Sequence, residues 1–294
     1  MYRVVAMAVI ALATPVAAAP AIDLTLAKTV LPGADDCGDV ECLIGRAYRA
    51  DPKAGQLALA MWTTGGDLAG VGADELLDGG YRGKIRLVSQ LPIKRYRRHL
   101  AWVSEATRSI DKFFTEAFAG LPPPHYRWRG LTFRFVRSLQ KRTPSAYATS
   151  WAITYNVEGS LLTSAAGVRE TVFHELFHNN DEDHGDWSAI HLQTDYDAIL
   201  AACRRRPISC LTPYAPSATM VRGGTYYAFQ QNNGDSVHEY AAELAVRYDK
   251  EQREMLATGK LKQPAFKCGP AENARAWKAL VDEFFGGQDL VPAC

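Results

Sequence analysis

The sequence predicts an α+β fold, and three observations lead to this prediction. An amphipathic helix is expected over residues 99–119, where apolar side chains recur at helical spacing and form one stripe. Two short stretches, residues 131–136 and 151–157, have the alternation or the aromatic and β-branched content that is typical of strands. Helical patterns follow at residues 168–178, 188–206, 235–255 and 271–285. We therefore expect a small mixed sheet followed by a helical C-terminal subdomain.

The first 21 residues have the pattern of a signal peptide. Arg3 supplies a positive charge, residues 4–12 are apolar but too short to span a bilayer, and residues 17–19 supply the small side chains of a cleavage site. The alternative is a retained anchor helix. No other stretch is long and apolar enough to cross a membrane. We expect a secreted or periplasmic protein that has no membrane association once residues 1–21 are removed.

The six cysteines fit an oxidising compartment, where disulfides form and persist. Proximity along the chain predicts three pairs: Cys37–Cys42, Cys203–Cys210 and Cys268–Cys294. Other pairings remain open, because connectivity does not follow from spacing alone. No C-x-x-C pair occurs, which argues against zinc–thiolate binding.

Residues 22–92 differ from the rest of the chain because they are rich in glycine and only weakly periodic. A helical patch is expected at residues 54–62, and paired or single glycines then mark turns. This composition predicts an accessory region or a removable pro-segment, followed by the main domain at residues 93–294. The sequence does not decide whether the region is removed.

Composition excludes some partners. The apolar content of 47% is sufficient for a full core, and the net charge of +1 argues against a nucleic-acid partner. Neither observation defines an oligomeric state.

The main motif is His174-Glu175-Leu176-Phe177-His178, an H-E-x-x-H pattern in an apolar helical setting. Residues four apart on a helix lie about 40° apart on one face, so His174 and His178 are able to bind one ion from the same side. Zinc accepts imidazole nitrogen well, and a catalytic zinc site leaves one position for water. Glu175 is rotated away from the two histidines and suits a general base acting on that water. We expect one zinc ion per chain.

This pattern resembles the zincin metallopeptidases. The resemblance implies a zincin-like domain, a peptide or protein substrate, and a strand before the motif helix that borders the cleft. An extended peptide pairs with such a strand through main-chain hydrogen bonds. In this chain the implied strand is residues 151–157.

Two residues compete as the third zinc ligand. The stretch around Glu239 resembles the third-ligand helix of gluzincins, in which a second acid, here Glu243, orients a zinc histidine. Both acids interrupt a helix that is otherwise apolar, and buried carboxylates need a metal or a donor. The alternative for Glu239 is a capping box with Ser236. His184 matches the spacing of metzincins, although Asp181 stands where that family has glycine.

Two further features near the motif have open interpretations. Four carboxylates at residues 181–186 predict an acidic loop that favours basic substrates, binds Ca²⁺, or is simply solvated. Tyr226 or Tyr227 is a candidate donor to an oxyanion, with aromatic core packing as the alternative.

Together these observations predict an exported zinc metalloendopeptidase with Glu175 as general base and His174, His178 and Glu239 as metal ligands. The alternative is an exported binding or scaffolding module that holds zinc without turnover. The substrate and the cleavage preference do not follow from the sequence.

Overall fold

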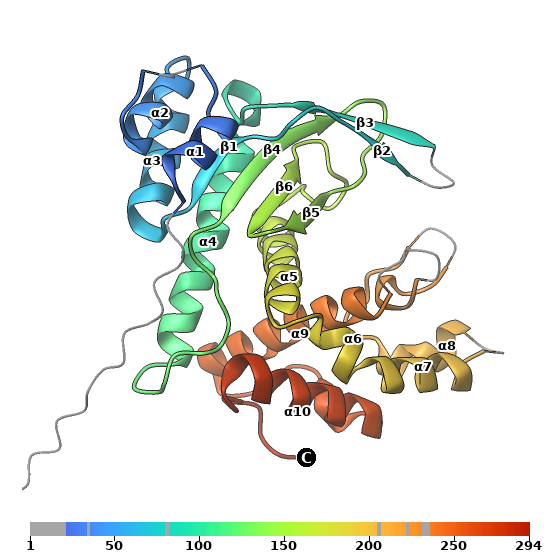
Figure 1. Cartoon of the computed structure of the whole chain (residues 1–294). Coiled ribbons are helices and arrows are strands. Elements are labelled where there is room, and N and C mark those ends of the chain that lie inside the picture. Colours follow the sequence, from blue (N-terminus) through green and yellow to red (C-terminus); the bar gives the residue numbers. More distant parts are fainter. Residues whose placement is uncertain (1–21, 34–35, 80–82, 205–206, 222–223, 231–235) are drawn as a thin grey trace, which may run out of the picture.

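The computed structural model describes residues 22–33, 36–79, 83–204, 207–221, 224–230 and 236–294. The predicted signal peptide at residues 1–21 lies outside them. The chain is a mixture of helices and one sheet, so the predicted α+β class is confirmed (Figure 1). None of the helices in the described ranges combines the length and the hydropathy that a membrane span requires.

Three helices open the described chain: α1 (Leu24–Val30), α2 (Val40–Ala47) and α3 (Pro52–Gly65). Each begins at an aspartate whose side chain accepts a hydrogen bond from a backbone N–H of the first turn. The predicted helical patch at residues 54–62 lies within α3. A Cβ at Gly70 would lie 2.2 Å from the Val30 carbonyl oxygen, so α1 lies this close to the following strand only because residue 70 is glycine.

One six-stranded sheet forms the upper part of the molecule in Figure 1. Its strands are β1 (Leu68–Val71), β2 (Glu75–Asp78), β3 (Lys84–Ser89), β4 (Thr132–Ser138), β5 (Ala146–Thr149) and β6 (Ala152–Asn156). The order is β2-β3-β4-β6-β5, and β1 pairs with β4 beside this path. β4 is parallel to β1 and β6, whereas the other pairs are antiparallel. The strands predicted at residues 131–136 and 151–157 are confirmed as β4 and β6.

The sheet changes the interpretation of residues 22–92. β1 and β3 both pair with β4, and α1 to α3 contribute to the same hydrophobic core as the rest of the chain. Strands on both sides of the predicted boundary at residue 92 therefore belong to one sheet.

The long helix α4 (Arg97–Ala117) follows a short 3₁₀ turn, η2 (Lys94–Tyr96), and confirms the helix predicted at residues 99–119. Its apolar stripe packs against the sheet face that carries Phe133, Phe135, Ile153 and Tyr155. The imidazole Nδ1 of His99 lies 2.9 Å from the Tyr155 hydroxyl in this interface.

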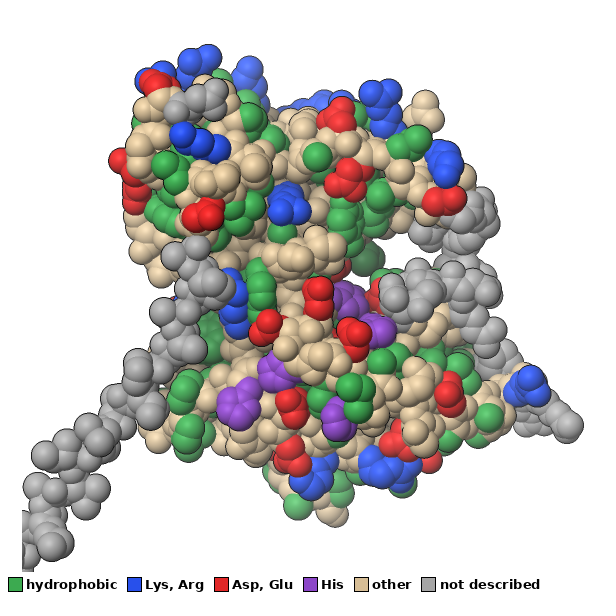
Figure 2. Space-filling view, viewed as in Figure 1, with side chains coloured by type: hydrophobic (Ala, Val, Ile, Leu, Met, Phe, Trp, Pro, Cys, Tyr) green, Lys and Arg blue, Asp and Glu red, His purple; other side chains and the backbone are tan. Residues whose placement is uncertain are grey.

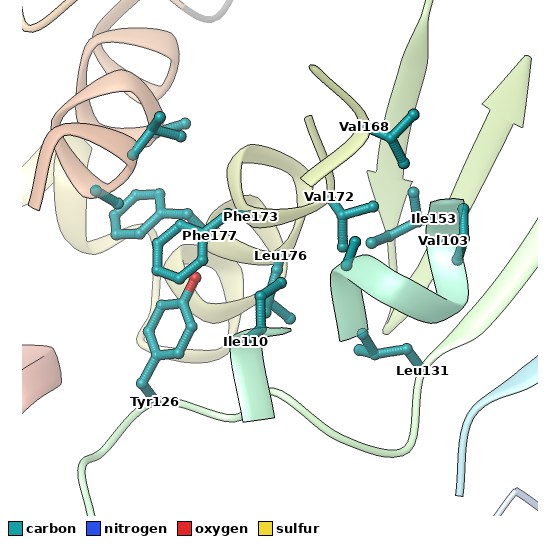
Figure 3. Close-up of a cluster of buried hydrophobic side chains, with 14 of the residues drawn as sticks. Val103, Ile110, Tyr126, Leu131, Ile153, Val168, Val172, Phe173, Leu176 and Phe177 are labelled. Carbon is teal, nitrogen blue, oxygen red and sulfur yellow. The ribbon is translucent and has the colours of Figure 1, made fainter. Parts of the chain in front are cut away.

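The central helix α5 (Ala165–Asp183) carries the H-E-x-x-H motif and begins at Ser164, whose hydroxyl accepts from the Gly167 N–H. Figure 3 shows Val168 and Val172 beside Ile153 and Val103, and Phe173 and Phe177 on the side of Tyr126. Residues on both sides of α5 are fully buried. α5 therefore joins the sheet to the helical lower part of the molecule.

The C-terminal part is helical, as predicted. Its elements are α6 (Trp187–His191), α7 (Gln193–Ala202), α8 (Pro207–Leu211), η3 (Thr212–Tyr214), η4 (Tyr227–Phe229), α9 (Ser236–Thr258), η5 (Phe266–Cys268) and α10 (Ala271–Phe285). The single helix expected at residues 188–206 is two short helices that meet at Leu192. All three predicted disulfides are present: Cys37–Cys42, Cys203–Cys210 and Cys268–Cys294.

Candidate metal centre

Three predicted ligands meet where α5 packs against α9. His174 and His178 lie one turn apart on α5, and Glu239 lies in the first turn of α9. The two Nε2 atoms are 3.1 Å apart. The Glu239 Oε2 lies 3.0 Å from the Nε2 of His174 and 3.7 Å from that of His178. The structure therefore brings together one donor atom from each of the three residues.

These separations fit one shared ion. Two ligand atoms that each lie about 2.0–2.2 Å from a tetrahedral zinc ion are about 3.3–3.6 Å apart. The three measured separations of 3.0, 3.1 and 3.7 Å lie within a few tenths of an ångström of that range. A set of two imidazoles and one carboxylate also leaves a fourth position for water.

A fourth side chain, Glu243, contacts the opposite nitrogen of His174. Its Oε1 lies 3.3 Å from the His174 Nδ1, and its Oε2 accepts a hydrogen bond from the Ser217 hydroxyl. Glu239 and Glu243 are one turn apart on α9, so both carboxylates face the same histidine. The predicted role of Glu243 as the partner of a ligand histidine agrees with this geometry.

The buried acids strongly perturb the titration of the centre. Burial lowers the pKa of His174, but hydrogen bonds from Glu239 and Glu243, together with the charges of Glu239 and Glu175, raise it well above its ordinary value. Burial raises the pKa of Glu239, yet the two histidines more than offset this and hold the pKa well below its usual range. The centre therefore favours a negatively charged carboxylate beside a positive charge, which a proton or a metal ion is able to supply.

Glu175 lies on α5 between the two histidines in sequence and is 7% exposed. Burial raises the pKa of its carboxyl group, the charges of His174 and His178 lower it, and the charge of Glu239 raises it. The net result is a raised pKa. A carboxylate with a raised pKa is a stronger base than an ordinary carboxylate.

The structure distinguishes the two candidate tyrosines. The Tyr227 ring centroid lies 5.8 Å from that of His174, and its hydroxyl hydrogen-bonds to Glu239. Burial is the largest cause of the raised pKa of Tyr227, so this phenol keeps its proton at neutral pH. The Tyr226 hydroxyl instead lies 3.0 Å from the Thr212 hydroxyl.

His184 does not join this group. Its Nδ1 lies 2.7 Å from the Glu283 Oε1, and its Nε2 lies 3.0 Å from the His125 carbonyl oxygen. Both nitrogens therefore already have partners outside the centre. The capping-box alternative for Glu239 also differs from the geometry, because the carboxylate reaches the two histidines of α5.

The predicted acidic loop after His178 is wrong in its first part. α5 continues to Asp183, and Asp181 is 1% exposed. Asp181 accepts hydrogen bonds from the Ser188 N–H at 2.7 Å and from the Ser188 hydroxyl at 2.5 Å. Aspartate often ends a helix by bonding to its own backbone, but the Asp181 carboxylate is already occupied by Ser188. The helix therefore continues through residue 181. Of the four carboxylates at residues 181–186, only Glu182, Asp183 and Asp186 are exposed.

Residues 179 and 180 position the site, and sequence reasoning did not identify them. The Asn179 Oδ1 accepts from the Trp151 N–H at 2.8 Å, which fastens the β5–β6 turn to α5. Asn180 exchanges two hydrogen bonds with the backbone of Arg127, at 2.7 and 3.0 Å. These amides fix two loops relative to the histidines. Nothing in their local sequence distinguishes them from residues that end a helix.

The end strand of the sheet beside α5 is β5, not the predicted stretch at residues 151–157. That stretch forms β6, which lies between β4 and β5 and has both edges paired. β5 is the end strand of the sheet, runs antiparallel to β6 and contacts α5. Figure 2 shows a hollow between the upper part, with the sheet, and the lower part, with α6 to α10. Histidine and acidic side chains gather in and around this hollow.

Comparisons with known proteins identify no relative. No protein-family model, curated protein or solved structure matches the chain. The functional argument therefore rests on the residues and their geometry.

Proposed function

We propose that this protein is an exported, zinc-dependent metalloendopeptidase. The observation that carries the proposal is the convergence of His174, His178 and Glu239 on one point, at separations that suit a tetrahedral zinc ion. The side chains of His174 and Glu239 are nearly buried, whereas that of His178 is 22% exposed. Solvent and substrate would reach the centre from the side of His178.

In the proposed reaction, the metal activates water and side chains of the protein transfer protons and orient groups. When bound, zinc supplies a Lewis acid that lowers the pKa of a water ligand towards ~7. Glu175 accepts the proton of the attacking water and then passes it to the leaving amine. The Tyr227 phenol, which hydrogen-bonds to Glu239 in this structure, would leave that carboxylate to the metal and donate its hydrogen bond to the oxyanion that develops on the peptide carbonyl. Glu243 holds the His174 ring by its Nδ1.

The proposed substrate is an extended segment of a peptide or protein. Within the described residues, one edge of β5 pairs with no other strand. The turn that follows β5 is held against α5 by the Asn179–Trp151 hydrogen bond. Main-chain groups on such an edge pair with an added strand, which places a substrate carbonyl beside the centre. The antiparallel end strand next to the motif helix supports a zincin-like fold, and Glu239 on α9 supports the gluzincin type of ligand set.

Export is part of the same proposal. The three disulfides support an oxidising compartment, and residues 1–21 have the pattern of a signal peptide. N-terminal sequencing of the secreted or periplasmic protein tests this proposal. A mature chain that still begins at Met1 contradicts removal of residues 1–21.

Zinc content and protein hydrolysis test the proposed enzyme. The wild type is expected to hold about one zinc ion per chain, and His178→Ala is expected to lose it. His191→Ala is the matched control, because His191 is exposed and stacks on Trp187 away from the centre. Unchanged zinc in His178→Ala contradicts the proposed site.

Glu175→Gln separates the peptidase from a zinc-holding module without turnover. The amide has the shape of the carboxyl group but does not accept the proton, so zinc should stay while hydrolysis of an unfolded protein falls by more than about a hundredfold. A wild type that binds zinc and hydrolyses no protein substrate favours the zinc-holding module. Near-wild-type hydrolysis by Glu175→Gln refutes the base assignment.

A further inference from the structure

We propose that Ser217 is a positioning residue that fixes the orientation of His174 through Glu243. This inference rests on the zinc site proposed above. Ser217 lies in the irregular segment between η3 and η4, and it is not one of the three residues whose donor atoms converge. Its hydroxyl donates to the Glu243 Oε2, while the other oxygen of that carboxylate faces the His174 Nδ1 at 3.3 Å.

The chain of contacts uses both oxygens of one buried carboxylate. Glu243 is 8% exposed, and a buried carboxylate is costly unless donors satisfy its oxygens. Ser217 satisfies one oxygen and His174 the other. If the serine hydroxyl is removed, the Glu243 Oε2 loses its hydrogen-bond donor. The carboxylate is then expected to rotate towards water, which weakens its contact with the His174 imidazole.

The local backbone fixes the direction of the serine hydrogen bond. The Thr219 N–H donates to the Ser217 oxygen at 3.3 Å, a short turn typical of serine and threonine. Because the oxygen accepts from the backbone, its own proton is free to go to Glu243. The Tyr227 N–H in turn donates to the Thr219 carbonyl at 2.8 Å. The segment that presents Ser217 to Glu243 is therefore hydrogen-bonded to the one that presents Tyr227 to Glu239.

The consequence for the metal is a fixed histidine tautomer. A carboxylate on the Nδ1 side holds the ring proton there and leaves the Nε2 lone pair for the ion. Partners of this kind typically change metal affinity by about 10–100-fold when they are removed. Ser217 is one contact further from the metal than Glu243, so the lower end of that range, about tenfold, is expected.

The experiment measures zinc affinity by competition with a chromophoric chelator. Ser217→Val should weaken zinc binding by about tenfold, whereas Ser217→Thr, which has nearly the same volume and keeps a hydroxyl, should stay within about threefold of the wild type. Ser89→Ala is the control, because it removes a hydroxyl that donates to the Gly72 carbonyl in the sheet region. Circular dichroism verifies the fold of each variant. If Ser217→Val does not fold, the zinc affinity of Ser217→Ala is compared with that of the wild type instead.

A double-mutant cycle tests whether Ser217 acts through Glu243. In a Glu243→Gln background, loss of the serine hydroxyl should add little, because residues that act through one network are not additive. An equal loss in both backgrounds, or wild-type affinity in Ser217→Val, overturns the inference while leaving the zinc site intact. A wild type that binds no zinc overturns the proposed function and this inference together.

Discussion

Two adjacent groups of buried polar side chains on α5 differ in how their atoms are satisfied. In the first, His174 and His178 point at each other and at Glu239, so several donor atoms share one point. In the second, Asn179, Asn180 and Asp181 each have a dedicated partner in another segment. His174 is 8% exposed and the side chain of His178 is 22% exposed, whereas Asn179, Asn180 and Asp181 are 1–2% exposed. Burial of polar groups therefore does not by itself mark a candidate ligand site, and convergence of donor atoms on one point is the observation that distinguishes the first group.

The second group has a definite structural task. Its three side chains fasten the β5–β6 turn, the segment before β4, and the start of α6 to successive residues of one helix. Changes in the first group should alter metal binding, and changes in the second should alter stability.

The largest expected effect is on metal affinity. Residues that hydrogen-bond to metal ligands typically change metal affinity by up to ~100-fold when they are removed. Glu239→Ala removes a proposed ligand itself, so it should weaken zinc binding by more than this. His184→Ala should keep wild-type affinity, because both nitrogens of His184 have partners away from the centre. Chelator competition on folded variants measures the difference. The reverse result, zinc lost in His184→Ala and kept in Glu239→Ala, would replace the gluzincin-type ligand set with the metzincin type.

A smaller effect is expected in the second group. Asp181→Ala removes the acceptor for the backbone N–H and the hydroxyl of Ser188, which is fully buried. Hydrogen bonds to a charged group contribute about 1.5–3 kcal/mol each, so the loss of both should lower the free energy of unfolding by about 3–6 kcal/mol. Denaturant unfolding of the metal-free protein measures this change. Glu182→Ala is the control, because Glu182 is exposed on the same helix. If Asp181→Ala leaves the free energy of unfolding unchanged, the proposed difference between the two groups is wrong. It is also wrong if this variant loses zinc affinity while its stability stays intact.

Asp67 is a buried carboxylate whose surroundings differ from those of both Glu239 and Asp181. Backbone N–H groups, rather than histidines or a serine hydroxyl, are its hydrogen-bond donors. It is 2% exposed and accepts from the Leu131 N–H at 2.9 Å. Burial raises its pKa to about 7, against the opposing effect of backbone hydrogen bonds from Leu131 and Gly130. Because the folded chain holds this proton more tightly than the unfolded chain, the stability contribution is complete below the unfolded pKa of about 4 and is lost as the pH rises through about 7.

Asp67→Asn should remove that pH dependence. Between pH 5 and pH 8 the wild type should lose about 2–3 kcal/mol of stability relative to the variant, because the amide keeps an acceptor for the Leu131 N–H and carries no charge. Unfolding at several pH values with a chelator present measures the difference, so that metal release does not contribute. A constant difference across this range would show that Asp67 is already ionised at pH 5 in the folded state.

The parts of the centre that the sequence predicts are those with a periodic signal. His174 and His178 are fixed by helical spacing, and Glu239 and Glu243 stand out as acids on an apolar helix face. The continuation of α5 past His178 was not predictable, because asparagine and aspartate usually favour helix ends and only distant partners reverse that preference. Ser217 gave no signal either, since it lies in an irregular segment and its contact partner is 26 residues away.

The sheet was predictable only in its longer strands. β4 and β6 have alternation or a buried apolar run, whereas β1 and β2 have four residues each and lie among glycines. A strand of four residues carries too little pattern to be recognised alone. The identity of the end strand depends on pairing order, which is a tertiary property, and for this reason β6 was mistaken for the strand beside the cleft.

The disulfide connectivity has a consequence for biosynthesis. Each cysteine is bonded to its nearest neighbour in sequence, and the bonded residues are separated by 5, 7 and 26 positions. A chain that crosses a membrane with its N-terminus first presents these cysteines in the order in which they pair. Each bond is then able to close before the cysteines of the next pair emerge. Oxidative folding of this protein should therefore require an oxidant for its thiols but little help from an isomerase that rearranges wrong pairs.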